Sequence, residues 1–167
     1  MAEPKAMRLK NCTIRFIDGT TPTPEELEIK VDDGNLQWTE KRTIDVKLDR
    51  GELDYLEEGD DVPCELTLDC RFAAVTSSSG DDVTPIEFLK KQGAASTFKS
   101  TAALCAADAI NIEVTVSHEC GTSIEDEIIT FSDFTYENIG GNFKDGTLNI
   151  SGKCNSKGPT SIRTTLA

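Results

Sequence analysis

Basic side chains are scarce in this chain. Among 167 residues, 17 are Lys or Arg and 30 are Asp or Glu, which gives a net charge of −13. Affinity for nucleic acid depends largely on Lys and Arg that neutralise phosphates. The charge balance therefore argues against a protein that holds nucleic acid tightly, and against binding to an anionic membrane surface.

Long apolar runs are missing as well. The first ten residues, MAEPKAMRLK, are charged and contain Pro4, so they resemble neither a signal peptide nor a membrane-spanning helix. We therefore expect a protein that is made and kept in a reducing cytosol and that does not bind membranes.

Motifs for catalysis and metal binding are also absent. There is no Ser-His-Asp order, glycine-rich phosphate loop or H-E-x-x-H motif, and no cysteine pair has the close spacing of a zinc site. The acidic stretch 49–61 does not match the ligand spacing of an EF-hand and is interpreted as a solvated loop. His118 and Cys120 are two apart and form a hypothetical thiol dyad, although a position at a strand end explains them more simply. The sequence predicts no enzyme, no metal and no cofactor.

Alternation of apolar and polar residues is the dominant pattern, and it predicts strands. In the segment 126–136 the alternation of apolar and polar residues is expected to shift register near Ser132. Predicted strands cover 12–16, 62–72, 110–120 and 126–136, and hairpins are predicted over 25–40, around Asp33-Gly34, and over 142–154, around Asp145-Gly146.

One helix is predicted after residue 83. Thr84 is its expected N-cap, Pro85 its first residue, Glu87 the partner in a capping box and Gly93 its end. Residues 93–108 form either a loop or a short second helix. The fold class is thus mainly β, a β-sandwich or barrel with one flanking α-helix, in a single domain over residues 1–167.

The cysteines follow the apolar faces of the predicted strands. Cys64 and Cys70 share a face with Leu66 and Leu68. Free cysteine packs as a small hydrophobic residue. We interpret five of the six as core thiols rather than as metal ligands or disulfides, namely Cys12, Cys64, Cys70, Cys120 and Cys154, and Cys105 lies in the small-residue stretch.

The segment 40–61 combines high charge with an apolar stripe. It contains nine acidic and four basic residues, yet Ile44, Val46 and Leu48 alternate with polar residues, and Leu53, Tyr55 and Leu56 follow. Such a stripe needs cover, because burying each apolar side chain is worth about 1.5–3 kcal/mol. Either the segment folds back onto its own domain or a neighbouring subunit covers it.

Residues 30–72, KVDDGNLQWTEKRTIDVKLDRGELDYLEEGDDVPCELTLDCRF, resemble the N-terminal half of tail tube proteins (major tail proteins) of tailed bacteriophages. Residues 105–120 and 125–155, CAADAINIEVTVSHEC and EDEIITFSDFTYENIGGNFKDGTLNISGKCN, resemble the C-terminal half. The resemblance covers residues 8–155 and rests on an ordered series of short patterns rather than on one signature.

The resemblance implies a non-catalytic virion protein. Six copies would form a ring with an inner β-barrel, and rings would stack into a tail tube, assembled in the host cytoplasm, that conducts DNA without binding it specifically. Expected partners are further copies, the tape measure, the tail tip and the terminator. The loop at about 40–61 would reach the next ring through Ile44, Val46, Leu48, Asp49, Arg50, Gly51, Leu53 and Tyr55.

An acidic lumen wall would let phosphates slide past. Two alternatives stay open: the related tube protein of a bacterial contractile secretion system and, from another class of protein, a cytosolic β-sandwich binding module. Candidate lumen-facing residues are Glu26, Glu28, Lys30 and Asp32 on one predicted strand, and Glu65, Thr67 and Asp69 on another.

Overall fold

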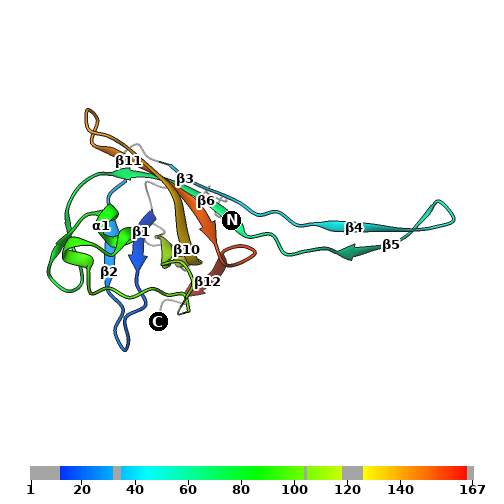
Figure 1. The fold of residues 1–167 in the computed structure, drawn as a ribbon, viewed down its shortest axis with the longest axis horizontal. Coiled ribbons are helices and arrows are strands. Elements are labelled where there is room, and N and C mark those ends of the chain that lie inside the picture. The colour runs from blue at the N-terminus through cyan, green and yellow to red at the C-terminus, as the bar shows by residue number, and fades with distance from the viewer. Residues whose placement is uncertain (1–11, 32–34, 104, 118–125, 165–167) are drawn as a thin grey trace, which may run out of the picture.

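Strands form most of the structure, a computed structural model that describes residues 12–31, 35–103, 105–117 and 126–164 (Figure 1). In chain order the elements are β1 (Cys12–Ile17), β2 (Glu26–Ile29), β3 (Leu36–Thr39), β4 (Ile44–Asp49), β5 (Glu52–Glu58), β6 (Cys64–Arg71), β7 (Val75–Thr76), β8 (Asp82–Val83), α1 (Pro85–Lys90), the 3-10 turn η2 (Gly93–Ala95), β9 (Ile110–Val116), β10 (Asp126–Asn142), β11 (Thr147–Cys154) and β12 (Thr160–Thr164). The mainly β fold class with one α-helix is confirmed. Within the described residues, no helix has the length and apolarity needed to cross a membrane.

A single eight-stranded sheet makes up the body, in the order β2-β1-β9-β10-β11-β6-β3, with β12 paired to β10. The 17-residue strand β10 serves both halves of this sheet, because its first part pairs with β9 and β12 and its second part with β11. Its register shifts between Phe131 and Phe134, where Asp133 has a φ of 53°, which confirms the slip expected near Ser132.

The sheet curves far enough that strands distant in its order approach one another. The backbone N–H of Arg71, at the end of β6, donates to the carbonyl of Lys30, just after β2, at 2.8 Å. Trp38 of β3 lies edge-on to Phe131 of β10, with ring centroids 5.7 Å apart. The body is therefore a strongly curved sheet wrapped around one core.

Side chains on one face of each long strand point into the core. Buried and exposed residues alternate through β6 and β11, as strand geometry requires. The largest fully buried side chains are Phe16, Phe88, Phe131, Phe134, Leu27, Leu66, Leu68, Ile110, Ile112 and Ile150.

Helix α1 begins where the sequence predicts. The N–H of Glu87 donates to Thr84 Oγ1 at 3.3 Å, and the N–H of Thr84 donates to Glu87 Oε2 at 3.0 Å, which completes the capping box. The helix ends at Lys90 rather than near Gly93, because Lys91 already takes the left-handed conformation, with a φ of 51°. Phe88 holds the helix on the body through Phe16, 5.9 Å away between ring centroids.

The predicted hairpin over 25–40 is wrong. Strand β2 pairs with β1, and β3 pairs with β6, so the two lie at opposite ends of the sheet order. Leu27 and Ile29 join the core beside β1, whereas Leu36 pairs with Leu68. Long-range apolar pairing determines the partners, and the turn signal at Asp33-Gly34 lies outside the described residues.

Three cysteines are buried in the core, as the sequence predicts: Cys64, Cys70 and Cys154. Cys12 is half-buried and Cys105 is exposed, while His118 and Cys120 lie outside the described residues. Burial raises the pKa of the Cys70 thiol to about 12 and that of Cys154 to about 12. Because the thiolate is the reactive species, both thiols are inert at neutral pH.

The rate of alkylation should distinguish the exposed thiol from the buried ones. We expect iodoacetamide at pH 8 to modify Cys105 rapidly in the folded protein, because that side chain is exposed, and to leave Cys70 and Cys154 unmodified over the same time. Peptide mass spectrometry measures the extent of labelling at each site. In urea all three should label alike, and rapid labelling of Cys70 in the folded state would contradict its place in the core.

Gly152 of β11 should be intolerant of a side chain. A Cβ there would collide with the carbonyl oxygen of Thr135 on β10, whereas a Cβ at Gly140 meets nothing within 4 Å. We expect Gly152→Ala to lower the free energy of unfolding by about 1–3 kcal/mol, the usual cost of overpacking, and Gly140→Ala to change it by less than about 0.5 kcal/mol. Urea denaturation of both variants measures the difference, and equal stabilities would contradict the close approach of β10 and β11.

Candidate functional site

The segment between β3 and β6 forms a long two-stranded hairpin that extends away from the body (Figure 1). Among the described strands, β4 and β5 pair only with each other, and every residue in them is exposed. An isolated two-stranded hairpin is at best marginally stable in water. The sequence leaves two alternatives open for this segment. In the structure it extends away from the body and does not fold back onto its own domain.

The tip of this hairpin is a two-residue turn. Arg50 has a φ of 53° and Gly51 a φ of 86°, between the paired residues Asp49 and Glu52. Two positive φ values define a type I′ turn, whose twist matches that of the flanking strands. Glycine adopts such angles without strain, which explains why it follows Arg50 here.

A bulge in β5 places the apolar residues on one face. Val46 pairs with Leu56 and Leu48 with Leu53, and the register shifts between Lys47 and Leu48. Leu53 and Leu56 are three apart, so a regular strand would point them to opposite faces. The extra residue in the bulge, Asp54, restores them to the same face.

The two faces of the hairpin therefore differ in chemistry. One is defined as the apolar face and consists of Ile44, Val46, Leu48, Leu53 and Leu56, with exposures from 43% for Ile44 to 78% for Leu53. The other is charged, and in it Lys47 Nζ lies 3.6 Å from Glu57 Oε2. Burial of each apolar side chain would contribute about 1.5–3 kcal/mol, so the apolar face is a strong candidate for contact with another chain.

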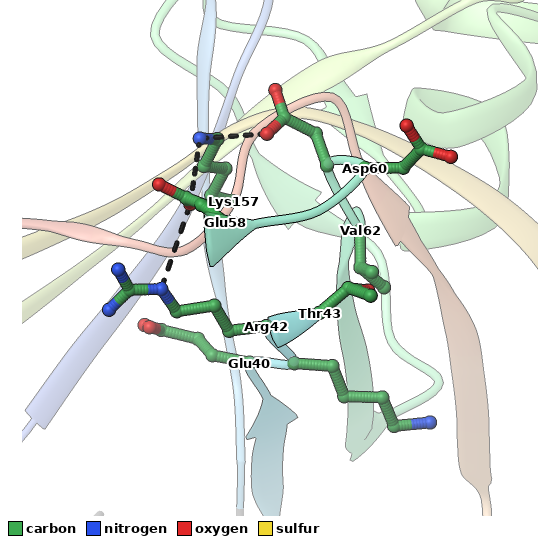
Figure 2. Close-up of a pocket in the computed structure, with 9 residues that line it drawn as sticks. Glu40, Arg42, Thr43, Glu58, Asp60, Val62 and Lys157 are labelled. Carbon is green, nitrogen blue, oxygen red and sulfur yellow. Dashed lines mark hydrogen bonds and ion pairs between the residues drawn. The ribbon is translucent and has the colours of Figure 1, made fainter. Parts of the chain in front are cut away.

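Charged residues surround the base of the hairpin (Figure 2). Lys157, in the turn after β11, lies 2.8 Å from Asp61 Oδ1 and 3.3 Å from Glu58 Oε1, and Arg42 Nε lies 3.7 Å from the same Glu58 oxygen. Hydrogen bonds to Asp61 and Glu58 raise the pKa of Lys157. Exposed ion pairs contribute little stability, so the direction of the hairpin depends mainly on its continuity with β3 and β6 and on the 2.8 Å hydrogen bond from Gly59 N to Thr43 O.

The sequence-predicted contact residues all lie in this hairpin, but not on one face. Ile44, Val46, Leu48 and Leu53 belong to the apolar face, Asp49 and Tyr55 to the charged face, and Arg50 and Gly51 to the turn. Leu56 is the apolar-face residue missing from the predicted set. Its apolar character is visible in the sequence, but the bulge that turns it to the same face as Leu53 is not.

The candidate lumen-facing residues lie on two strands of the body. Glu26, Glu28 and Lys30 alternate with the buried Leu27 and Ile29, and Lys30 Nζ pairs with Glu28 Oε1 at 3.2 Å. Asp32 lies outside the described residues.

The second group, on β6, alternates with buried residues in the same way. Glu65 and Thr67 are exposed, and Asp69 is half-buried and accepts a hydrogen bond from the Asn149 amide. Four strands separate β6 from β2 along the sheet order. The described members of both groups therefore lie on the outer surface of the body, and the ends of β2 and β6 meet where Arg71 N donates to the Lys30 carbonyl, although β2 and β6 are not paired in the sheet. No group of three or more potential metal ligands occurs among the residues that the structure describes.

Comparisons with known proteins give a distant structural similarity. No family model matches the chain, and no curated protein matches it. A chain in the cryo-EM structure of the anti-feeding prophage (AFP) baseplate, 6-fold symmetrised, is 10% identical with a TM-score of 0.48, and the match covers 99% of this chain and 100% of that chain. At this identity and TM-score, the similarity assigns neither a function nor a partner to the present protein.

The apolar face should be dispensable for folding of the subunit. We expect Leu56→Asp, at a side chain that is 67% exposed, to change the free energy of unfolding by less than about 0.5 kcal/mol. The same substitution at Leu66, which is 1% exposed, should cost more than about 3 kcal/mol, because it puts a carboxylate in the core. Urea denaturation of dilute monomer measures both. Unfolding of Leu56→Asp would show that the apolar face packs on its own subunit.

Proposed function

We propose that this chain is the structural subunit of a phage tail tube, which assembles as hexameric rings and stacks them into a conduit for DNA. The observation that supports the proposal most strongly is the extended hairpin with its apolar face, whose residues stay exposed beside the part of the chain that the structure describes. The tail tube resemblance of residues 30–72, which include this hairpin, points in the same direction.

The hairpin would act as the contact between rings. Its apolar face would be buried against a copy in the next ring, with Asp49, Arg50, Gly51 and Tyr55 at the margins of the contact. Five partly exposed apolar side chains at about 1.5–3 kcal/mol each would give a contact of useful strength even after the cost of association. Because every ring carries several copies, many such contacts act together.

The body would supply the ring and its lumen. Among the described strands the edge strand β3 pairs with β6 alone, so pairing of β3 between copies would satisfy backbone groups that a lone subunit leaves to water. Glu26, Glu28, Lys30 and Asp32, or Glu65, Thr67 and Asp69, would line the lumen, where a shortage of basic side chains keeps DNA from binding. The tape measure, tail tip and terminator would be partners at the ends of the tube.

Assembly of the purified protein tests this function. We expect the wild-type chain, concentrated and viewed by negative-stain electron microscopy, to form hollow rings or tubes with sixfold views, and light scattering to give the matching mass. Leu48→Asp and Leu56→Asp should prevent stacking, because each puts a charge on the apolar face. Ile162→Asp is the matched control: it adds the same charge on β12, outside the hairpin, at a side chain that is 63% exposed.

Two results would count against the proposal. A wild-type chain that stays monomeric at all concentrations would favour a cytosolic binding module. If Leu56→Asp formed tubes as well as the wild-type chain, the tube proposal would stand, but the apolar face would be excluded as the contact between rings. A tube protein of a secretion system would assemble in the same way and would be distinguished by the particle in which it occurs.

A further inference from the structure

A second exposed apolar feature lies at the opposite end of the body from the hairpin. Strands β6 and β11 run between the two ends: Cys64 pairs with Cys154 beside the hairpin base, and Arg71 pairs with Thr147 at the far end. The turn between β10 and β11 lies at this far end. Figure 1 shows that turn and the β4–β5 hairpin at opposite ends of the molecule.

Phe143 is the residue of interest in the turn. Its side chain is 90% exposed, and its ring meets that of the half-buried Phe72 at 5.9 Å between centroids and 63° between planes. The turn is held by its own hydrogen bonds, from Lys144 N to Asn142 Oδ1 at 2.9 Å and from Asn142 Nδ2 to Asp145 Oδ2 at 3.0 Å. Phe143 is thus presented to solvent by an ordered turn rather than by a loose tail.

The charges at the two ends are complementary. Residues 44–58 of the hairpin contain six acidic and two basic side chains, a net charge of −4. At the other end, Lys144 follows Phe143 directly and Arg71 precedes Phe72, with Asp145 as the acidic residue of the same turn. In a chain with a net charge of −13, this makes the Phe143 end the less acidic surface and the better match for the hairpin.

We propose that Phe143 and Phe72 form the acceptor for the apolar face of the β4–β5 hairpin of a second copy of this chain. This inference rests on the proposed function, because it names the surface that the hairpin meets in the next ring. Donor and acceptor at opposite ends of one subunit give a head-to-tail contact, which repeats without closing and so builds a stack. The same separation prevents a hairpin from reaching the acceptor of its own chain.

Trp38 is a weaker acceptor, although its side chain is 46% exposed. It lies on β3, whose last residue, Thr39, leads into the hairpin base, and its ring already contacts Phe131. An acceptor beside the hairpin base would bring two hairpins of net charge −4 together, which like-charge repulsion opposes. The Phe143 end avoids this repulsion.

Photo-crosslinking tests the contact directly. Phe143 is replaced by p-benzoylphenylalanine, and chains labelled with ¹⁴N and ¹⁵N are mixed before assembly, irradiated and digested. We expect mass spectrometry to find the turn peptide joined to a peptide from residues 44–58 of the other isotope. The same photoreactive residue at Ile162, 63% exposed on β12, is the matched control and should give no such product.

Substitution gives an independent measure. We expect Phe143→Asp to raise the protein concentration at which tubes form about tenfold or more, which corresponds to about 1.4 kcal/mol. Ile162→Asp should leave that concentration unchanged. The 90% exposure of Phe143 predicts that the melting temperature of the dilute monomer stays the same, so loss of tubes would not reflect unfolding.

The outcomes separate the two proposals. Tubes that form normally while Phe143 crosslinks to another region, or while Phe143→Asp has no effect, would overturn the acceptor and leave the tail tube function intact. A wild-type chain that forms neither rings nor tubes would overturn both. Hairpin-to-turn crosslinks between isotopes, together with the tenfold effect, would establish the head-to-tail contact.

Discussion

The bend in β10 is the constraint on which the rest of the structure depends. This single strand bonds to β9 and β12 with its first part and to β11 with its second, and the change of direction occurs at Asp133, whose N–H donates to the Asn111 amide oxygen at 3.0 Å. Because the strand bends, the apolar faces of both halves enclose one core. That core is complete without β4 and β5, and this is why the hairpin is left outside it.

A hairpin outside the core still has a specific construction. A strand pair without function would be expected to be short and uniformly polar, since exposed apolar edges promote aggregation. Here the turn at Arg50-Gly51 matches the strand twist, and the bulge at Asp54 brings Leu53 and Leu56 to the same face as Val46. Both local irregularities serve one result, a face on which Val46, Leu48, Leu53 and Leu56 lie together, with Glu58 opposite Ile44 at its base. Exposed apolar residues of this kind add little to the stability of the subunit, and a covering partner is the explanation that the proposed function supplies.

The sequence predicts local features well and distant pairing poorly. The capping box at Thr84 and Glu87 and the alternation along β6 are encoded within a few residues, and the structure confirms them. The pairing of β2 and β3 depends on which apolar faces meet in the core, so the turn signal at Asp33-Gly34 misleads. The same holds for the apolar face. The place of Val46 on it can be predicted from alternation, whereas the place of Leu56 depends on a bulge that no spacing rule reveals.

Charge explains why self-association of such an acidic chain would have a direction. Copies with a net charge of −13 repel one another, and at physiological salt this repulsion is screened beyond about 8 Å. The charges that matter are therefore those at the contact itself. Two hairpins placed face to face would bring two net charges of −4 together, whereas at the turn Lys144 offsets Asp145 and Arg71 lies next to Phe72, so a hairpin there would meet less like charge. Apolar burial would then provide the affinity of a stacked assembly, and local charge would select head-to-tail order over head-to-head order.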